Sequence, residues 1–183
     1  DKVRGAQLRV RRVRAGEQLE TLDGVLRALD PADGVIVDGD DVPIALAGVM
    51  GGASTEISDT TTDVIVEAAW WDPQSVADTS ARHNLHSEAS ARFKRGMDPD
   101  IADRALDRLA ELLVQQDAAT LRPGSVVAEG NLPERVTVAV RPARVNAVLG
   151  LSLDRSTMVD LIDPIGFTAD TAGDDLSVTI PSW

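Results

Sequence analysis

A diglycine and an isolated carboxylate are the residues of this chain most suited to bind a ligand. Gly51-Gly52 lacks side chains, so a ligand can approach the main chain closely there, and glycine also adopts backbone angles closed to other residues. Glu67 interrupts the apolar run 64–71, and a charge in such a run needs a partner or a function. These residues predict a ligand site.

Each of these features also has a purely structural interpretation. Without further motifs, Gly51-Gly52 is more often a tight turn, and Glu67 is more often ion-paired, here with Arg82 or Arg92. Trp70 and Trp71 could stack on nucleobases, but aromatic residues after a buried strand more often belong to the core and its rim.

Two other constellations give weaker chemical signals. His83 and His86, with Glu88, have a spacing that could suggest a metal site, but a convincing third ligand is missing, and surface or helix-terminal roles are favoured. Near Glu67 the sequence contains no Ser-His-Asp order and no nucleophile elbow. We therefore expect no bound metal, and we assign Glu67 to recognition.

Composition limits the class of protein. The 183 residues are 43% hydrophobic, which predicts a soluble globular protein of one or two domains. The absence of cysteine excludes disulfides and thiolate sites and favours a cytoplasmic protein, and no apolar run is long enough for a membrane span. The start at Asp1-Lys2, without methionine, suggests an excerpt of a larger protein.

Charge also restricts the possible partners. The net charge of −12 argues against bulk attraction to nucleic acid. Two basic clusters could still meet phosphate, or could equally pair with neighbouring carboxylates; they are Lys2, Arg4, Arg9, Arg11, Arg12 and Arg14, and Arg82, Arg92, Lys94 and Arg95.

The elements around the diglycine read as a small, mostly antiparallel sheet. Alternation over 7–13 predicts a strand with Leu8 and Val10 inside and a basic solvent face. Further strands are predicted at 35–37, 44–49 and 64–66, with a hairpin turn at 21–24 and an acidic turn at 38–41. The last strand would place Ile65 and Glu67 on one face.

Three helices follow, each with a capping residue. Asp72-Pro73 opens the first, Ser87 caps the second over 88–95 before Gly96, and Asp98-Pro99 opens the longest, 100–116. The longest helix carries an apolar stripe that predicts docking against the sheet; the stripe comprises Ile101, Ala105, Leu106, Leu109, Leu112 and Leu113.

Turn signals at 121–124 and 130–133, flanking a short strand, predict a domain boundary, with domains 1–130 and 131–183. The second domain reads as a strand containing Val136, Val138 and Val140, helices at 142–149 and 154–163 separated by Gly150, and a terminal strand at 176–180. This order resembles a helix-turn-helix module with strands at its edges. Its helices lack an obvious basic face, so packing is favoured over nucleic-acid binding.

Three motifs, taken together, resemble a known family. They are Gly48-Val49-Met50-Gly51-Gly52, the segment 66–73 (VEAAWWDP) and the segment 82–99 (RHNLHSEASARFKRGMDP). In this order and spacing they resemble the B3/B4 domain of bacterial phenylalanyl-tRNA synthetase beta subunits, and 144–183 resembles most of the B5 domain that follows it. The expected fold is α+β, with a mixed or antiparallel sheet and packed helices, followed by the small helix-turn-helix-like module.

The resemblance implies an editing site that hydrolyses tyrosine wrongly esterified to the 3′ end of phenylalanine tRNA. By motif, Glu67 would accept the phenol hydroxyl, Gly51 and Gly52 would form a backbone wall, and Ser87 and Ala89 would shape the pocket. The water would be held by backbone groups near the diglycine and by the terminal ribose hydroxyl.

The family also implies partners and cofactors. The partners would be phenylalanine tRNA and the alpha subunit, in an assembly of two alpha and two beta subunits; ATP and Mg²⁺ would serve the parent enzyme's synthetic site, with no cofactor in this fragment. A histidine-bearing loop of the family would lie just before Asp1, so we expect weak or absent deacylation by the fragment alone. The alternatives are a non-catalytic scaffold that holds tRNA or the partner subunit, and a metal-dependent hydrolase using His83 and His86.

Overall fold

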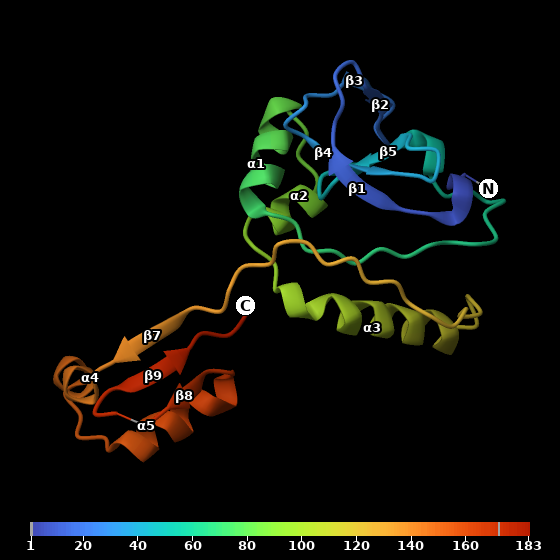
Figure 1. The fold of residues 1–183 in the computed structure, drawn as a ribbon. Helices are drawn as coiled ribbons and strands as arrows, with labels where there is room; N and C mark the ends of the chain where they lie inside the picture. Colours follow the sequence, from blue (N-terminus) through green and yellow to red (C-terminus); the bar gives the residue numbers. More distant parts are fainter. Residues whose placement is uncertain (1, 172) are drawn as a thin grey trace. The chain divides into compact units, whose positions relative to one another are not determined.

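The computed structural model describes residues 2–171 and 173–183, and the chain divides into two compact units, Asp1–Leu121 and Arg122–Trp183 (Figure 1). Both units combine antiparallel strands with helices, which confirms the α+β class. None of the helices in the described ranges combines the length and apolar character that crossing a membrane would require.

An antiparallel four-stranded sheet, in the order β1-β4-β5-β6, organises the first unit. Its strands are β1 (Arg9–Arg12), β4 (Gly34–Val37), β5 (Pro43–Leu46) and β6 (Met50–Gly51). A hairpin of β2 (Gln18–Glu20) and β3 (Leu26–Ala28) lies between β1 and β4 in sequence. Its turn contains Gly24 at φ +75°, as the Asp-Gly signal predicts. The predicted strand 44–49 is in fact β5, a turn at 47–49 and β6.

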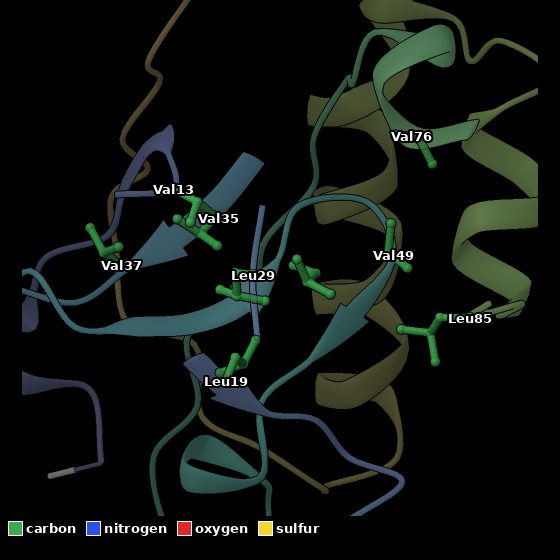
Figure 2. Close-up of a cluster of buried hydrophobic side chains, with 9 residues drawn as sticks. Val13, Leu19, Leu29, Val35, Val37, Val49, Val76 and Leu85 are labelled. Atoms are coloured by element: carbon green, nitrogen blue, oxygen red, sulfur yellow. The ribbon is translucent and has the colours of Figure 1, made fainter. Parts of the chain in front are cut away.

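The core of this unit is built on β4. Val35 and Val37 are completely buried, and Leu46 of β5 is 1% exposed. Figure 2 shows the cluster, in which side chains of the strands meet Val76 and Leu85 from the helical segment. The continuous apolar run Val35-Ile36-Val37 therefore forms a strand buried on both faces.

Strand β1 forms as predicted, but the prediction of which side chains face the core was wrong. Val10 is 59% exposed and Leu8 is 39% exposed, whereas Arg11 is the half-buried residue of the strand. The reason is electrostatic, because Arg11 turns inward to bind the carboxylates of Glu17 and Asp41. A paired arginine with an apolar stem can occupy a position that alternation alone assigns to an aliphatic residue.

The helices begin at their predicted caps. Helix α1 (Pro73–Arg82) has Asp72 as N-cap, accepting from the Ser75 amide, and α2 (Glu88–Phe93) has Ser87 in a capping box with Ser90. Asp98 caps the short 3₁₀ turn η3 (Pro99–Ile101), which leads into α3 (Ala102–Gln115). Two further 3₁₀ turns are η1 (Arg4–Ala6) and η2 (Ala53–Thr55). Helices α1 and α2 lie against each other (Figure 1).

The predicted docking of α3 against the sheet is wrong for this structure. The helix buries none of its residues within the described part of the chain, and Ile101 and Leu109 are 42% and 39% exposed. The amphipathic pattern forms a helix with an apolar stripe, but periodicity does not specify which surface covers that stripe.

The predicted strand 64–66 is also wrong. The segment from Glu56 to Asp72 contains only a turn, and Val64 and Ile65 are each 58% exposed. The three β-branched residues have strand propensity, but within the described ranges no neighbouring strand pairs with them. A strand is stable only where another strand satisfies its backbone groups.

In the second unit, a three-stranded antiparallel sheet, in the order β7-β9-β8, carries two helices. Its elements are β7 (Thr137–Val140), α4 (Pro142–Leu149), α5 (Arg155–Ile162), η4 (Asp163–Ile165), β8 (Thr168–Asp170) and β9 (Leu176–Thr179). Met158, Leu176 and Val178 form its core, and Gly150 ends α4 at φ +67°. The two predicted helices are confirmed; β8 was not predicted, and no strand forms at 125–129.

Candidate functional site

The diglycine ends the edge strand β6. Gly51 pairs with Ala45 of β5, the Gly51 carbonyl accepts from the Leu22 amide at 3.0 Å, and the Gly52 amide donates to the Ile44 carbonyl at 2.7 Å. A Cβ on Gly52 would lie 2.6 Å from the Ile44 oxygen. Gly52 has a φ of −89°, and Gly51 is not among the glycines with positive φ. Glycine is therefore required here for close approach by the protein's own atoms, and not for unusual backbone angles.

The glycine that uses a left-handed conformation is Gly48, in the turn just before β6. Its φ is +68°, and a Cβ there would lie 2.8 Å from Trp71 and 2.9 Å from Val76. The turn thus packs directly on Trp71, which precedes α1, and on Val76 within α1. Trp71 packs against the core, which agrees with its prediction as a core or rim residue.

Ser87 connects α2 to this turn. Its hydroxyl donates to the Val49 carbonyl at 2.5 Å and accepts from the Ser90 amide at 3.0 Å. Ala89 lies in the first turn of α2 and is half-buried. The structure therefore places Ser87 at the turn that precedes Gly51. The Ser87 hydroxyl is already engaged as donor and acceptor, so it is poorly suited to act as a nucleophile.

Glu67 does not form the ion pair with Arg82 or Arg92 that is its structural alternative. Its side chain is exposed, and among residues 2–171 and 173–183 it makes no hydrogen bond or salt bridge. Arg82 binds Asp33 instead, and Arg92 lies 3.8 Å from Glu88. Surrounding protein still desolvates the carboxyl enough to raise the pKa of Glu67 above its ordinary value. The Glu67 side chain is thus exposed to solvent but also partly desolvated by the protein around it.

The histidines have structural roles. His83 Nε2 lies 2.6 Å from the Asp33 carboxylate, and His86 Nδ1 lies 3.4 Å from the Ser80 hydroxyl. In the part of the chain that the structure describes, no three potential ligands among His, Cys, Asp and Glu gather closely enough to hold a metal ion.

Asp33 is a buried carboxylate that the sequence did not reveal. Its side chain has no exposed surface, and it accepts from His83, Arg82 and the Asp30 amide. Burial alone would raise the pKa of Asp33, but the hydrogen bond from His83 and the other donors outweigh it and hold the pKa below its usual range. The only sequence signal is a turn-forming Asp-Gly, which says nothing about burial.

Ion pairs occupy most of the first basic cluster. Arg11 binds Glu17 at 2.6 Å and Asp41 at 3.0 Å, and Arg14 also pairs with Asp41. The hydrogen bond to Glu17 raises the pKa of Arg11, and the hydrogen bond from Arg11 lowers the pKa of Asp41. These contacts favour the structural interpretation of this cluster over phosphate binding. In the second cluster, Lys94 and Arg95 are exposed after α2.

Comparison with known families gives a match over the region that contains β6 and α2. A family model described as the B3/4 domain matches residues 1–117, which include all five predicted pocket residues. The chain belongs to the B3/4 domain family. A second model, the tRNA synthetase B5 domain, matches residues 138–183, so the predicted resemblance is confirmed for both parts.

Curated relatives of this B3/4 chain are phenylalanine–tRNA ligase beta subunits. The protein from Corynebacterium glutamicum is 45% identical over 174 residues, covering 95% of this chain and 21% of the relative. Those from Thermobifida fusca and Streptomyces avermitilis are 44% and 47% identical, covering 96% and 100% of this chain. The chain spans about a fifth of the length of these relatives.

Proposed function

We propose that this chain is the editing region of a phenylalanine–tRNA ligase beta subunit, which hydrolyses tyrosine wrongly esterified to the 3′ end of phenylalanine tRNA. Membership of the B3/4 family and the relatives' names support the parent enzyme. The observation that most supports the site is the Glu67 carboxylate, which makes no hydrogen bond or salt bridge in the described chain. Glu67 lies four residues before Trp71, and Trp71 packs on the turn that leads to Gly51.

Discrimination between tyrosine and phenylalanine requires a group that binds the phenol hydroxyl. A pocket that merely tolerates one substrate has little leverage against a single added hydroxyl. A site that hydrogen-bonds this hydroxyl can disfavour the analogue lacking it by up to about 10⁴–10⁵. Glu67 is suited to this role because, when ionised, its oxygens accept hydrogen bonds, and a charged acceptor forms a stronger bond than a neutral one.

The remaining roles follow the positions of the other residues. Ser87 and Ala89, at the start of α2, shape the wall next to the turn at Val49. The Gly51 carbonyl accepts one hydrogen bond from Leu22 and keeps a second lone pair, so it is a candidate to orient the hydrolytic water. The terminal ribose hydroxyl of the tRNA also helps to hold the water, since the Ser87 hydroxyl is already engaged as donor and acceptor.

The same proposal assigns the wider context. The parent enzyme would pair this beta subunit with alpha subunits, two of each, in the cytoplasm. ATP and Mg²⁺ would serve amino-acid activation elsewhere in the enzyme, and this region would work without a cofactor. The domain limits would be 1–130 for B3/B4 and 131–183 for B5.

The test is deacylation of tyrosyl-tRNA by the full enzyme, wild type against Glu67→Ala. Loss of a hydrogen bond to a charged group predicts a rate lower by about 10- to 100-fold. Glu56→Ala is the matched control, since Glu56 is also exposed in the same irregular segment. Wild-type deacylation with an unchanged Glu67→Ala rate would contradict the role of Glu67. An inactive wild type would indicate the alternative, a scaffold that holds tRNA or the partner subunit without editing.

A further inference from the structure

The Asp33 carboxylate is the most completely buried charge whose partners come from a distant segment. Two of its donors, Arg82 and His83, stand at the end of α1, fifty residues further along the chain. Asp33 itself immediately precedes β4, and its own carbonyl accepts from the Val13 amide at 3.1 Å. A buried charge is costly unless it is paired, so loss of the contact between Asp33 and its partners Arg82 and His83 would be strongly unfavourable.

On the helical side, hydrogen bonds between Ser80 and Leu85 fix the chain between the end of α1 and Ser87. The Leu85 amide donates to the Ser80 carbonyl at 2.9 Å, and the Ser80 hydroxyl donates to the Leu85 carbonyl at 2.7 Å. Leu85 is 5% exposed and belongs to the core cluster (Figure 2). Ser87 follows after two residues and caps α2. A displacement of the end of α1 is therefore transmitted to Ser87.

On the sheet side, Asp33 is connected to the diglycine strand through β4 and β5. The Ala47 amide donates to the Gly34 carbonyl at 3.0 Å, next to Asp33, and β5 then pairs with β6 at Gly51. Among the described residues, polar contacts thus join the sheet to the α1–α2 segment at two places. One is at Asp33, where Arg82 also lies 4.0 Å from the Asp30 carboxylate, and the other is between Ser87 and Val49. The apolar packing of Gly48 on Trp71 lies between these segments as well, but apolar contacts are non-directional.

We infer that Asp33, held by His83 and Arg82, is a positioning residue that fixes Ser87 and Ala89 relative to Gly51 in the editing pocket. Val76 and Leu85 already pack the helical segment into the core, and the polar contacts at Asp33 and Ser87 add directional constraints at two separate points. This inference rests on the proposed editing function. Asp33 touches no substrate and acts only through α1.

The test compares two substitutions of His83 in the full enzyme. His83→Leu removes one of the two side-chain donors to Asp33 and leaves Arg82, whereas His83→Gln offers an amide donor in a similar position. We expect kcat for tyrosyl-tRNA deacylation to fall by about 10- to 100-fold in His83→Leu, with KM little changed, because small displacements act on the reacting geometry. His83→Gln should restore most of the activity. Asp41→Asn is the matched control, since Asp41 also pairs with arginines, but these are Arg11 and Arg14, in and after β1.

Hydrogen–deuterium exchange on the same proteins provides a readout that does not depend on editing. In His83→Leu the amides of α2, from Ser90 onward, should exchange faster than in wild type, and in Asp41→Asn they should not. Unchanged α2 exchange, or equal deacylation by His83→Leu and wild type, would overturn the positioning role. If the wild-type enzyme does not deacylate, the proposed function fails, while the exchange result still decides whether Asp33 positions α2.

Discussion

The Ser87 hydroxyl donates to the Val49 carbonyl while it also caps α2, so one side chain joins the helix start to the turn that precedes the diglycine. The two residues are 38 positions apart in sequence. Val49 is 2% exposed, so its carbonyl has little access to water as an alternative donor. The bond therefore combines a local and a long-range role.

Replacing Ser87 should cost more than the loss of a helix cap. Ser87→Ala removes the cap, worth about 0.5–2 kcal/mol, and the bond to Val49, worth about 0.5–1.5 kcal/mol. Urea unfolding followed by fluorescence of the tryptophans, including Trp71, measures the sum. Asp72→Ala is the control, because Asp72 caps α1 without reaching the turn. Equal losses for the two substitutions would show that the Val49 bond contributes nothing to stability.

Replacement of Gly48 should be costly for two reasons, its backbone angles and its packing. Gly48→Ala combines a left-handed backbone with contacts of 2.8 and 2.9 Å to Trp71 and Val76, so we expect a loss of about 2–4 kcal/mol. Gly24→Ala isolates the backbone term, since Gly24 has φ +75° and no atom near its Cβ position. Its cost should be about 1–2 kcal/mol. If thermal unfolding shows equal losses for both, the packing at Trp71 is not tight.

Asp33 predicts a definite dependence of stability on pH. Because the pKa of Asp33 is lower in the folded state, its contribution is fully present above the unfolded value of about 3.9 and is lost as pH falls through the folded pKa. Asp33→Asn should therefore be less stable than wild type at pH 7, by about 3–5 kcal/mol for a broken buried pair.

The difference between Asp33→Asn and wild type should shrink as the pH falls below about 3.9. Chemical unfolding at a series of pH values measures it. Asp59→Asn, in an exposed turn, should show little difference at any pH. A difference between Asp33→Asn and wild type that stays constant with pH would mean that the Asp33 carboxylate is not preferentially stabilised in its charged form.

Local signals in the sequence predicted most of the elements, and long-range partners explain where prediction failed. The caps Asp72, Ser87 and Asp98 act on amides within three residues, so the helix starts were predictable. Inward-facing Arg11 was not predictable, because alternation does not show that Glu17 and the distant Asp41 supply carboxylates at its position. The exposed segment around Ile65 failed for the same kind of reason, since strand propensity does not supply a neighbouring strand.

In the candidate site, too, local motifs were predictable and long-range contacts were not. Motif resemblance predicted Ser87 and the diglycine as pocket residues, and the structure brings Ser87 to the turn before Gly51. The pairing of Asp33 with His83 was not visible, because neither residue lies in a pattern that indicates burial. The roles of all five residues in the pocket stay predictions: Gly51, Gly52, Glu67, Ser87 and Ala89.

The most direct test of the central claim is the ratio of kcat/KM for hydrolysis of tyrosyl-tRNA and phenylalanyl-tRNA by the full enzyme. If Glu67 binds the phenol hydroxyl, Glu67→Ala should lower the tyrosyl value by about 10- to 100-fold and leave the phenylalanyl value nearly unchanged, so the preference for tyrosine collapses. If Glu67→Ala lowers both values equally, or neither, the preserved ratio would contradict recognition of the hydroxyl by Glu67.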